Sequence, residues 1–225
     1  MAHDKTSNHV ALLAGATGLV GQEVLKLLLA DQSYTAIHVV GRRAPSVQHL
    51  KLVIHTSTSF ADFTCPAVDD VIIALGTTIK VAGSQAAFKA IDGDAVVAIA
   101  AAAKVAGASR LAVVSAMGAS AQSGVFYNKV KGEMEVAVSQ LGFETVVIAR
   151  PSLLAGDRDA LKQPERAAEK LSLLAFKLFK PLLPANYRSI QASSVARAMV
   201  STLQTAGAGR HVLLSGDMQM YPRFA

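Results

Sequence analysis

The chain has 225 residues, enough for one large α/β domain with a substantial hydrophobic core or for two small ones. Hydrophobic residues make up 52 % and charged residues 17 %, a composition that excludes an intrinsically disordered protein. The formal charge is +6, but no run of five or six basic residues occurs and aromatic residues make up only 5 %, so we expect no nucleic-acid binding.

Short apolar runs alternate with segments of helical periodicity over the first 150 residues. The sequence predicts strands at 10–15, 36–43, 50–55, 70–76, 110–119 and 143–152, and helices at 19–32, 84–91, 94–108 and 127–142. Strands that are almost continuously apolar, and that alternate with helices, predict a parallel sheet with both faces covered. We therefore expect an α/β protein with a doubly wound parallel sheet, the Rossmann fold.

The first chemical motif, GATGLVG, lies between the first strand and its helix, where a dinucleotide pyrophosphate binds in such folds. Gly15 allows a sharp exit from the strand, Gly18 leaves room for a phosphate against bare backbone, and Gly21 lets helix and strand pack closely. Backbone N–H groups at the start of the helix would bind the phosphates, and they belong to Thr17, Leu19 and Val20.

The end of the second strand indicates which dinucleotide binds. NAD sites usually carry Asp or Glu about 20 residues after the glycine loop, where it accepts hydrogen bonds from the adenosine ribose. This chain has Arg42 and Arg43 there instead, and two guanidinium groups suit a 2′-phosphate. The sequence therefore favours NADP(H), with NAD(H) still possible and an exposed basic loop as the alternative interpretation.

The segment ALGTT ends the fourth strand, so we expect the backbone of Leu75, Gly76 and Thr77 to face the cofactor beside the switch point of the sheet. An ordinary glycine turn is an equally good interpretation. The two acidic residues before this strand, Asp69 and Asp70, are expected in a loop.

The fifth strand and the helix after it carry the candidate catalytic residues. Tyr127 and Lys131 are four residues apart and share one helix face, and Ser115 ends the preceding strand. The three side chains can therefore converge beside a nicotinamide ring. A nearby ammonium lowers the pKa of a phenol and brings it closer to the working range of an acid–base catalyst.

After Pro151 the residue pattern changes to an apolar and basic segment. A helix at 193–207 and a last strand at 210–216 are predicted beyond it. No linker separates this part from the rest. We expect residues 1–225 to form a single domain, with a small substrate cap at about 152–190 built onto the same sheet.

GATGLVG, VVSAMGA and YNKVK, in this order, resemble the short-chain dehydrogenase/reductase superfamily, specifically atypical members with a G-x-x-G-x-x-G loop. The segments LGTTIKVAGSQAAFKAID, FYNKVKGEMEVAV and IARPSLLAGDR are most similar to the HTATIP2/TIP30-like oxidoreductase group. This resemblance, over about residues 9–200, implies NADP(H) binding. It implies that Tyr127 is the acid/base, that Lys131 binds the nicotinamide ribose and lowers the tyrosine pKa, and that Ser115 orients the substrate. Arg150 and Pro151 would end the sixth strand beside the nicotinamide.

One residue departs from the superfamily's pattern. Many relatives have an asparagine before the fourth helix that is assigned to a proton relay, whereas this chain has Asp92. Three functions remain open: an NADP(H)-dependent oxidoreductase acting on a small carbonyl or alcohol, an NADP(H)-binding regulator or sensor without catalysis, and, ranked last, a sugar-nucleotide epimerase.

Other residues bear on compartment and on competing chemistries. The six histidines show no ligand spacing, so we expect no metal site, and Cys65 is expected to be a small apolar residue rather than a nucleophile. The start of the chain lacks a secretory pattern, and no stretch approaches the roughly 18 apolar residues of a membrane span. With a single cysteine, these features predict a cytoplasmic protein with no integral membrane segment; a homodimer is left open.

Overall fold

The computed structural model describes residues 8–57, 59–60, 63–155 and 185–221. These residues form one domain around a seven-stranded sheet with the strand order β3-β2-β1-β4-β5-β6-β9. Every neighbouring pair of strands in this sheet is parallel. The strands are β1 (His9–Ala14), β2 (Tyr34–Gly41), β3 (Leu52–Thr56), β4 (Asp70–Ile73), β5 (Arg110–Val114), β6 (Thr145–Arg150) and β9 (Gly209–Leu214), and a separate parallel pair joins β7 (Leu154–Ala155) to β8 (Ile190–Gln191).

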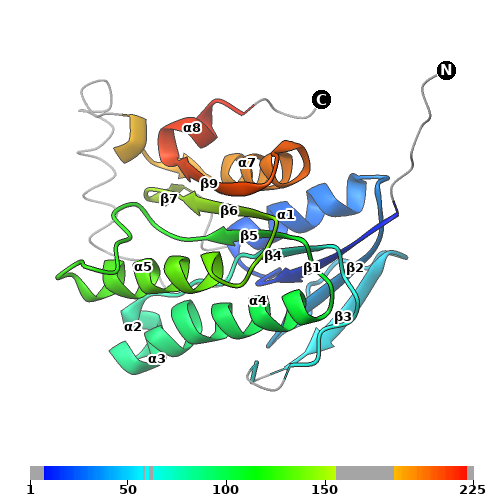
Figure 1. Cartoon of the computed structure of the whole chain (residues 1–225), viewed down its shortest axis with the longest axis horizontal. Helices are drawn as coiled ribbons and strands as arrows, with labels where there is room; N and C mark the ends of the chain where they lie inside the picture. The colour runs from blue at the N-terminus through cyan, green and yellow to red at the C-terminus, as the bar shows by residue number, and fades with distance from the viewer. Residues whose placement is uncertain (1–7, 58, 61–62, 156–184, 222–225) are drawn as a thin grey trace.

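Helices cover both faces of the sheet, and Figure 1 shows α4 and α5 on one face with α1 and α7 on the other. The described helices are α1 (Leu19–Ala30), α2 (Ile79–Ala82), α3 (Gln85–Lys89), a π-helical turn (Ala90–Asp94), α4 (Ala95–Val105), α5 (Phe126–Ser139), a 3₁₀ turn (Ala185–Tyr187), α7 (Ala192–Thr205) and α8 (Ser215–Gln219). The expected doubly wound α/β fold is confirmed.

Side chains of each strand alternate between the two faces, because successive residues of a strand point to opposite sides. Ala11 and Leu13 of β1 pack in the core beneath α1 and α7, whereas Leu12 and Ala14 pack in the core beneath α4 and α5. All four are fully buried, which explains why the strands are almost continuously apolar in sequence.

The order of the strands reverses next to β1. The chain first moves outward from β1 to β2 and β3, and it then returns to place β4 on the other side of β1. In open α/β sheets, ligands bind outside the carboxyl ends of the strands at such a switch point. The loops that follow β1, β4 and β5 therefore line the expected ligand crevice.

The structure corrects one expectation, and another concerns residues that lie mostly outside the described ranges. Asp70 is not in a loop: it is the first residue of β4 and is fully buried, whereas Asp69 precedes the strand as expected. The buried carboxylate is accommodated because Arg110 and the Tyr34 hydroxyl bind it. The expected cap at about 152–190 falls mostly outside the described residues.

Candidate functional site

The glycine loop after β1 has the geometry that its sequence predicts. Gly15 has φ +87°, and a Cβ there would lie 2.6 Å from the Ala74 carbonyl oxygen at the end of β4. A Cβ on Gly21 would lie only 2.0 Å from the Gly15 oxygen, so this glycine lets α1 pack against the loop. At Gly18 the nearest atom to a Cβ is the Gly15 oxygen at 3.4 Å, an ordinary van der Waals contact, so packing within the chain does not require a glycine there.

The amino end of α1 is suited to bind an anion. Gly18 is its N-cap residue, with no side chain to accept a hydrogen bond from the first turn, and this turn has no acidic residue. The N–H groups of Leu19 and Val20 therefore meet no capping side chain, and together with the helix dipole they favour a phosphate. Thr17 lies just before the cap, and its carbonyl accepts a hydrogen bond from the Gln22 side chain. The loop thus fits a dinucleotide pyrophosphate.

Arg42 and Arg43 follow the last residue of β2, Gly41, at the carboxyl edge of the sheet. Both side chains are exposed, and neither makes an ion pair or hydrogen bond to the described part of the chain. Their guanidinium groups are thus available to an anionic ligand, while the exposed-loop interpretation is equally compatible with this geometry.

The segment after β4 is held in place by a packed side chain and by a backbone hydrogen bond. Leu75 packs against the core on the α4 side and Gly76 is exposed. The Thr77 N–H donates to Asp92 Oδ2 over 2.8 Å, and the Thr78 side chain caps α2. The Thr77 amide is therefore used inside the protein.

The three candidate catalytic residues come from the carboxyl end of β5 and from α5. Ser115 directly follows β5 and is buried, Lys131 is 2 % exposed, and Tyr127 is partly exposed in the first turn of α5. Lys131 Nζ lies 3.4 Å from the Val114 carbonyl oxygen, which brings the ammonium to the end of β5. The Tyr127 ring packs against Phe88, with ring centroids 5.2 Å apart.

Both Ser115 and Lys131 have a buried carboxylate partner. Lys131 Nζ lies 2.7 Å from Asp92 Oδ1, and Ser115 Oγ donates to Glu135 Oε1 over 2.5 Å. Glu135 lies four residues after Lys131, so it continues the stripe of Tyr127 and Lys131 on α5. The same spacing in the sequence could have revealed Glu135, which the sequence analysis missed.

Glu135 also binds two arginines. Arg150, the last residue of β6, donates from Nε to Oε1 (2.9 Å) and from Nη2 to Oε2 (2.5 Å), and these hydrogen bonds raise the pKa of its guanidinium. Arg210 of β9 donates to Oε2 over 3.2 Å. The Arg150 side chain is thus engaged within the protein, while the next residue, Pro151, accepts a hydrogen bond from the Met117 N–H through its carbonyl.

Two further expectations concern histidine and cysteine. His38 Nδ1 and His55 Nε2 lie 2.9 Å apart across β2 and β3, and burial together with the charge of His55 lowers the pKa of His38. This pair lacks the further ligands of a metal site, since the described residues contain no group of three or more His, Cys, Asp or Glu that could hold a metal. Burial raises the pKa of the Cys65 thiol to about 11, so little thiolate forms near neutral pH.

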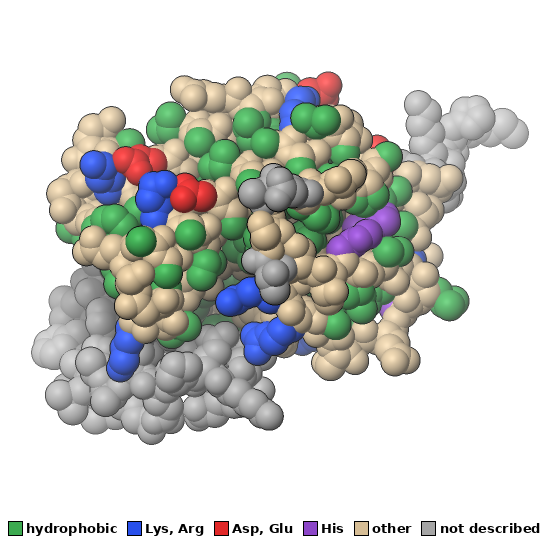
Figure 2. All heavy atoms as spheres, turned by 90° about the horizontal axis from the view of Figure 1, so that it is seen from below, with side chains coloured by type: hydrophobic (Ala, Val, Ile, Leu, Met, Phe, Trp, Pro, Cys, Tyr) green, Lys and Arg blue, Asp and Glu red, His purple; other side chains and the backbone are tan. Residues whose placement is uncertain are grey.

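On the face shown in Figure 2, lysine and arginine side chains are scattered among hydrophobic and other groups rather than gathered into one patch. Within the described ranges, no helix combines the length and the hydropathy that crossing a membrane requires.

Comparison with known proteins agrees with this geometry. The family model described as NAD(P)H-binding matches residues 15–206, from the first glycine of the loop into the segment after α7. The chain belongs to this NAD(P)H-binding family. A nicotinamide dinucleotide is therefore the cofactor class of the family, and the residues of the loop fit it.

The chain is similar to curated fungal proteins over most of its length. "Protein FMP52, mitochondrial" from Coccidioides immitis is 35 % identical over 205 residues, which are 84 % of this chain and 83 % of the relative. The protein of the same name from Meyerozyma guilliermondii is 39 % identical over 155 residues, 67 % of each chain.

Solved structures share the fold. A short chain dehydrogenase family protein from Francisella tularensis has a TM-score of 0.69 at 15 % identity and covers 95 % of this chain and 100 % of that one. The Bordetella bronchiseptica enzyme WbmG, in complex with NAD, has a TM-score of 0.65 at 18 % identity. The match covers 96 % of this chain and 75 % of the WbmG chain. These structures show that the chain shares their fold, and the family model shows the NAD(P)H-binding family. The HTATIP2/TIP30-like subgroup is not shown by these matches.

The expectation of a cytoplasmic location is wrong, because the curated relatives are named as mitochondrial proteins. That expectation came from the single cysteine and from the lack of a secretory pattern. Both observations concern disulfides and secretion, and neither distinguishes the cytosol from another compartment inside the cell.

Proposed function

We propose that the protein is an NADP(H)-dependent oxidoreductase that acts on a small carbonyl or alcohol, with Ser115, Tyr127 and Lys131 as its catalytic residues. The observation that carries the proposal is the burial of the Lys131 ammonium at the end of β5, on the α5 face that also bears Tyr127. A cation and a phenol that share one face of α5, in a family that binds NAD(P)H, support this assignment.

The chemistry follows from these groups. Bound NADPH would supply a hydride to the carbonyl carbon of the substrate, and the carbonyl oxygen then needs one proton. Tyr127 donates this proton from its hydroxyl, and the positive charge of Lys131 stabilises the phenolate that remains. A proton from solvent restores the phenol, so each turnover consumes one carbonyl, one NADPH and one proton. In the opposite direction Tyr127 accepts the proton of an alcohol.

Ser115 has a narrower role than the superfamily resemblance implies. A hydroxyl has one proton, and here it is donated to Glu135. In this arrangement Ser115 offers only lone pairs to a substrate, which suits the hydroxyl of an alcohol better than a carbonyl oxygen.

The coenzyme preference and the relatives complete the proposal. Arg42 and Arg43, both exposed at the end of β2, support NADP(H) over NAD(H). The resemblance of several motifs supports placing the chain near the HTATIP2/TIP30-like group, and the names of the fungal relatives support a mitochondrial location.

The test is Tyr127→Phe. We expect this variant to bind NADPH with unchanged Kd, since the ring still packs against Phe88, and to lose about 10²–10⁴-fold in turnover of any aldehyde, ketone or quinone that the native protein reduces. Tyr221→Phe is the matched control, because it removes a hydroxyl that contacts Thr202 on α7. Native turnover by Tyr127→Phe would contradict the assignment.

A sensor of NADP(H) without catalysis is the second candidate, and one observation favours it. Ser115 and Lys131 are both bound by buried carboxylates, as expected if these residues serve packing rather than a substrate. Micromolar NADPH binding with no NADPH oxidation across a carbonyl panel would support the sensor and count against the oxidoreductase.

A further inference from the structure

Asp92 is a buried carboxylate with two partners from different parts of the fold. Its side chain is 1 % exposed. Oδ2 accepts a hydrogen bond from the Thr77 N–H over 2.8 Å, and Oδ1 lies 2.7 Å from Lys131 Nζ. One side chain therefore connects the segment after β4 with α5.

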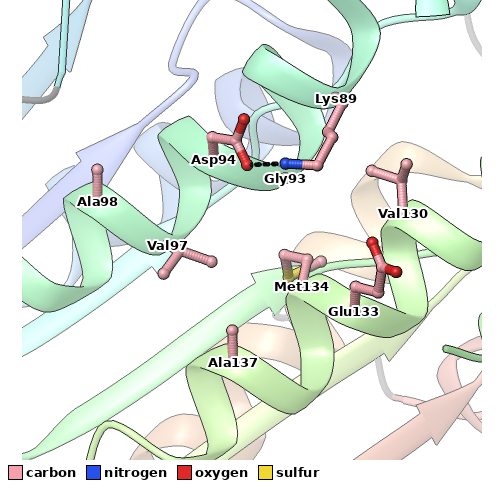
Figure 3. Close-up of a pocket in the computed structure, with 9 residues that line it drawn as sticks. All are labelled: Lys89, Gly93, Asp94, Val97, Ala98, Val130, Glu133, Met134 and Ala137. Atoms are coloured by element: carbon pink, nitrogen blue, oxygen red, sulfur yellow. Dashed lines mark hydrogen bonds and ion pairs between the residues drawn. The ribbon is translucent and has the colours of Figure 1, made fainter. Parts of the chain in front are cut away.

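The turn that carries Asp92 contains two carboxylates, of which one is buried and the other is exposed to solvent. Residues Ala90–Asp94 form a π-helical turn between α3 and α4, and such turns are frequent at functional sites. Asp94, at the end of the same turn, is 62 % exposed and pairs with Lys89 (2.5 Å). Figure 3 shows this exposed pair beside the pocket between α4 and α5, which the triad residues do not line. Asp94 thus provides a natural comparison for Asp92.

Stability alone is a weak reason for a pair such as Asp92 and Lys131. Both side chains are at most 2 % exposed, and removing two charges from water costs several kcal/mol per ion before their attraction is counted. Well-packed apolar residues often stabilise a core as well or better. A pair of this kind indicates that the position of the two charged groups matters.

The position of the pair relates it to one half of the dinucleotide. In doubly wound folds the pyrophosphate lies at the amino end of α1 and the adenosine ribose at the end of β2. The other nucleotide then extends to the opposite side of β1, over β4 and β5. Thr77 follows β4, and Lys131 reaches the Val114 oxygen at the end of β5, so Asp92 binds groups on this nicotinamide side only.

We propose that Asp92 is a positioning residue that holds Lys131 and the segment after β4 for the nicotinamide nucleotide of the cofactor. This inference rests on the proposed NADP(H) site. The carboxylate holds the Lys131 ammonium by a close ion pair and anchors the Thr77 backbone. A donor of the ammonium that does not bind the Val114 oxygen is thereby oriented for the ribose hydroxyls.

The experiment compares two ligands by titration calorimetry. NADPH carries both nucleotides, whereas 2′,5′-ADP carries only the adenosine half with its 2′-phosphate. For Asp92→Asn we expect the Kd of NADPH to rise about tenfold, because the ion pair that holds Lys131 is lost, while the Kd of 2′,5′-ADP stays within about twofold. For the control Asp94→Asn, which removes the same charge from the same turn, we expect neither Kd to change.

Each other outcome overturns the inference in a recognisable way. If Asp92→Asn weakens both ligands equally, Asp92 has only a structural role; if it weakens neither, Asp92 does not position the site. If the native protein binds neither ligand, the proposed function itself fails and this inference fails with it. Should Asp92→Asn not fold, Asp92→Glu keeps the buried negative charge but displaces the carboxylate, and it must show the same selective loss of NADPH affinity.

Discussion

At the scale of single residues, the glycine loop gives the sharpest prediction. A Cβ on Gly21 would lie 2.0 Å from the Gly15 oxygen and 2.7 Å from its carbonyl carbon, and both are backbone atoms that cannot rotate away. We expect Gly21→Ala to lower the free energy of unfolding by about 1–3 kcal/mol or more, as overpacking does, and to abolish NADPH binding because α1 must move. Urea unfolding and calorimetry measure the two effects.

Gly124→Ala is the control for this variant. No atom lies within 4 Å of a Cβ at Gly124, and its φ is outside the left-handed region. Its stability should therefore change by no more than about 0.5 kcal/mol. A Gly21→Ala protein as stable as the native one would show that the loop and α1 are not packed as described.

The triad shows what the sequence could and could not predict at this scale. Tyr127 and Lys131 share a face because of their helical spacing, which is local information. Ser115 and Glu135 are 20 residues apart in the sequence, and Lys131 and Asp92 are 39 residues apart, yet both pairs are in contact. Such contacts depend on which strands are neighbours in the sheet, and no local pattern encodes this. The sequence therefore predicted the residues of the candidate site but not their partners.

At the scale of elements, short segments were the ones that sequence periodicity missed. The helix α2 has four residues and α8 has five, while β7 and β8 have two each. Segments of this length show less than two helical turns or one strand alternation, so their sequence carries no detectable period. They depend on context instead: Thr78 caps the start of α2, and Gly83, with φ +89°, ends it.

The burial of Asp70 at the start of β4 also depends on structural context, because its partners lie on other strands. It gives a prediction at the scale of elements. The Tyr34 hydroxyl of β2 donates to Asp70 Oδ2 over 2.6 Å, and Arg110 of β5 donates to both carboxylate oxygens, so the cluster joins strands on both sides of the switch point. Asp70→Asn leaves Arg110 without its counter-ion. We expect the free energy of unfolding to fall by about 3 kcal/mol, the lower end for a broken buried pair, because Arg110 keeps 20 % exposure.

Urea unfolding measures this loss, and Glu133→Gln supplies the comparison. Glu133 is 45 % exposed and lies 3.9 Å from Lys129 on the surface of α5, so its removal should cost no more than about 1 kcal/mol. Equal losses for the two variants would mean that the Asp70 cluster contributes nothing beyond a surface pair.

At the scale of the whole molecule, the fold was predictable because one signal recurs along the chain. Each strand of the main sheet except β3 has mostly buried or half-buried apolar residues, and each of the longer helices presents one apolar face to the sheet. The edge strand β3 is half exposed, and its pattern was correspondingly weaker in the sequence. The subcellular compartment was not predictable. Composition indicates whether disulfides and membrane spans are expected, but it does not distinguish one compartment inside the cell from another.

The coenzyme preference also belongs to the whole molecule, because the proposed cofactor site extends from β2 to β5. We expect NADPH to raise the melting temperature more than NADH at equal concentration, since only NADPH carries the 2′-phosphate that Arg42 and Arg43 can bind. A ligand at a hundred times its Kd adds about 2.7 kcal/mol to the free energy of unfolding, and each tenfold loss in affinity removes about 1.4 kcal/mol of this gain.

Replacing both arginines, and comparing the result with the loss of two positive charges elsewhere, tests whether the position of these charges matters. In Arg42→Ala/Arg43→Ala, the advantage of NADPH over NADH should disappear while stabilisation by NADH remains, because the adenosine ribose and pyrophosphate are still bound by the loop after β1. The control Lys26→Ala/Lys129→Ala also removes two positive charges, but from exposed positions on α1 and α5, and it should keep the NADPH advantage. If NADH stabilises the native protein as much as NADPH does, the exposed arginines are not a phosphate site and the basic end of β2 is only a solvated loop.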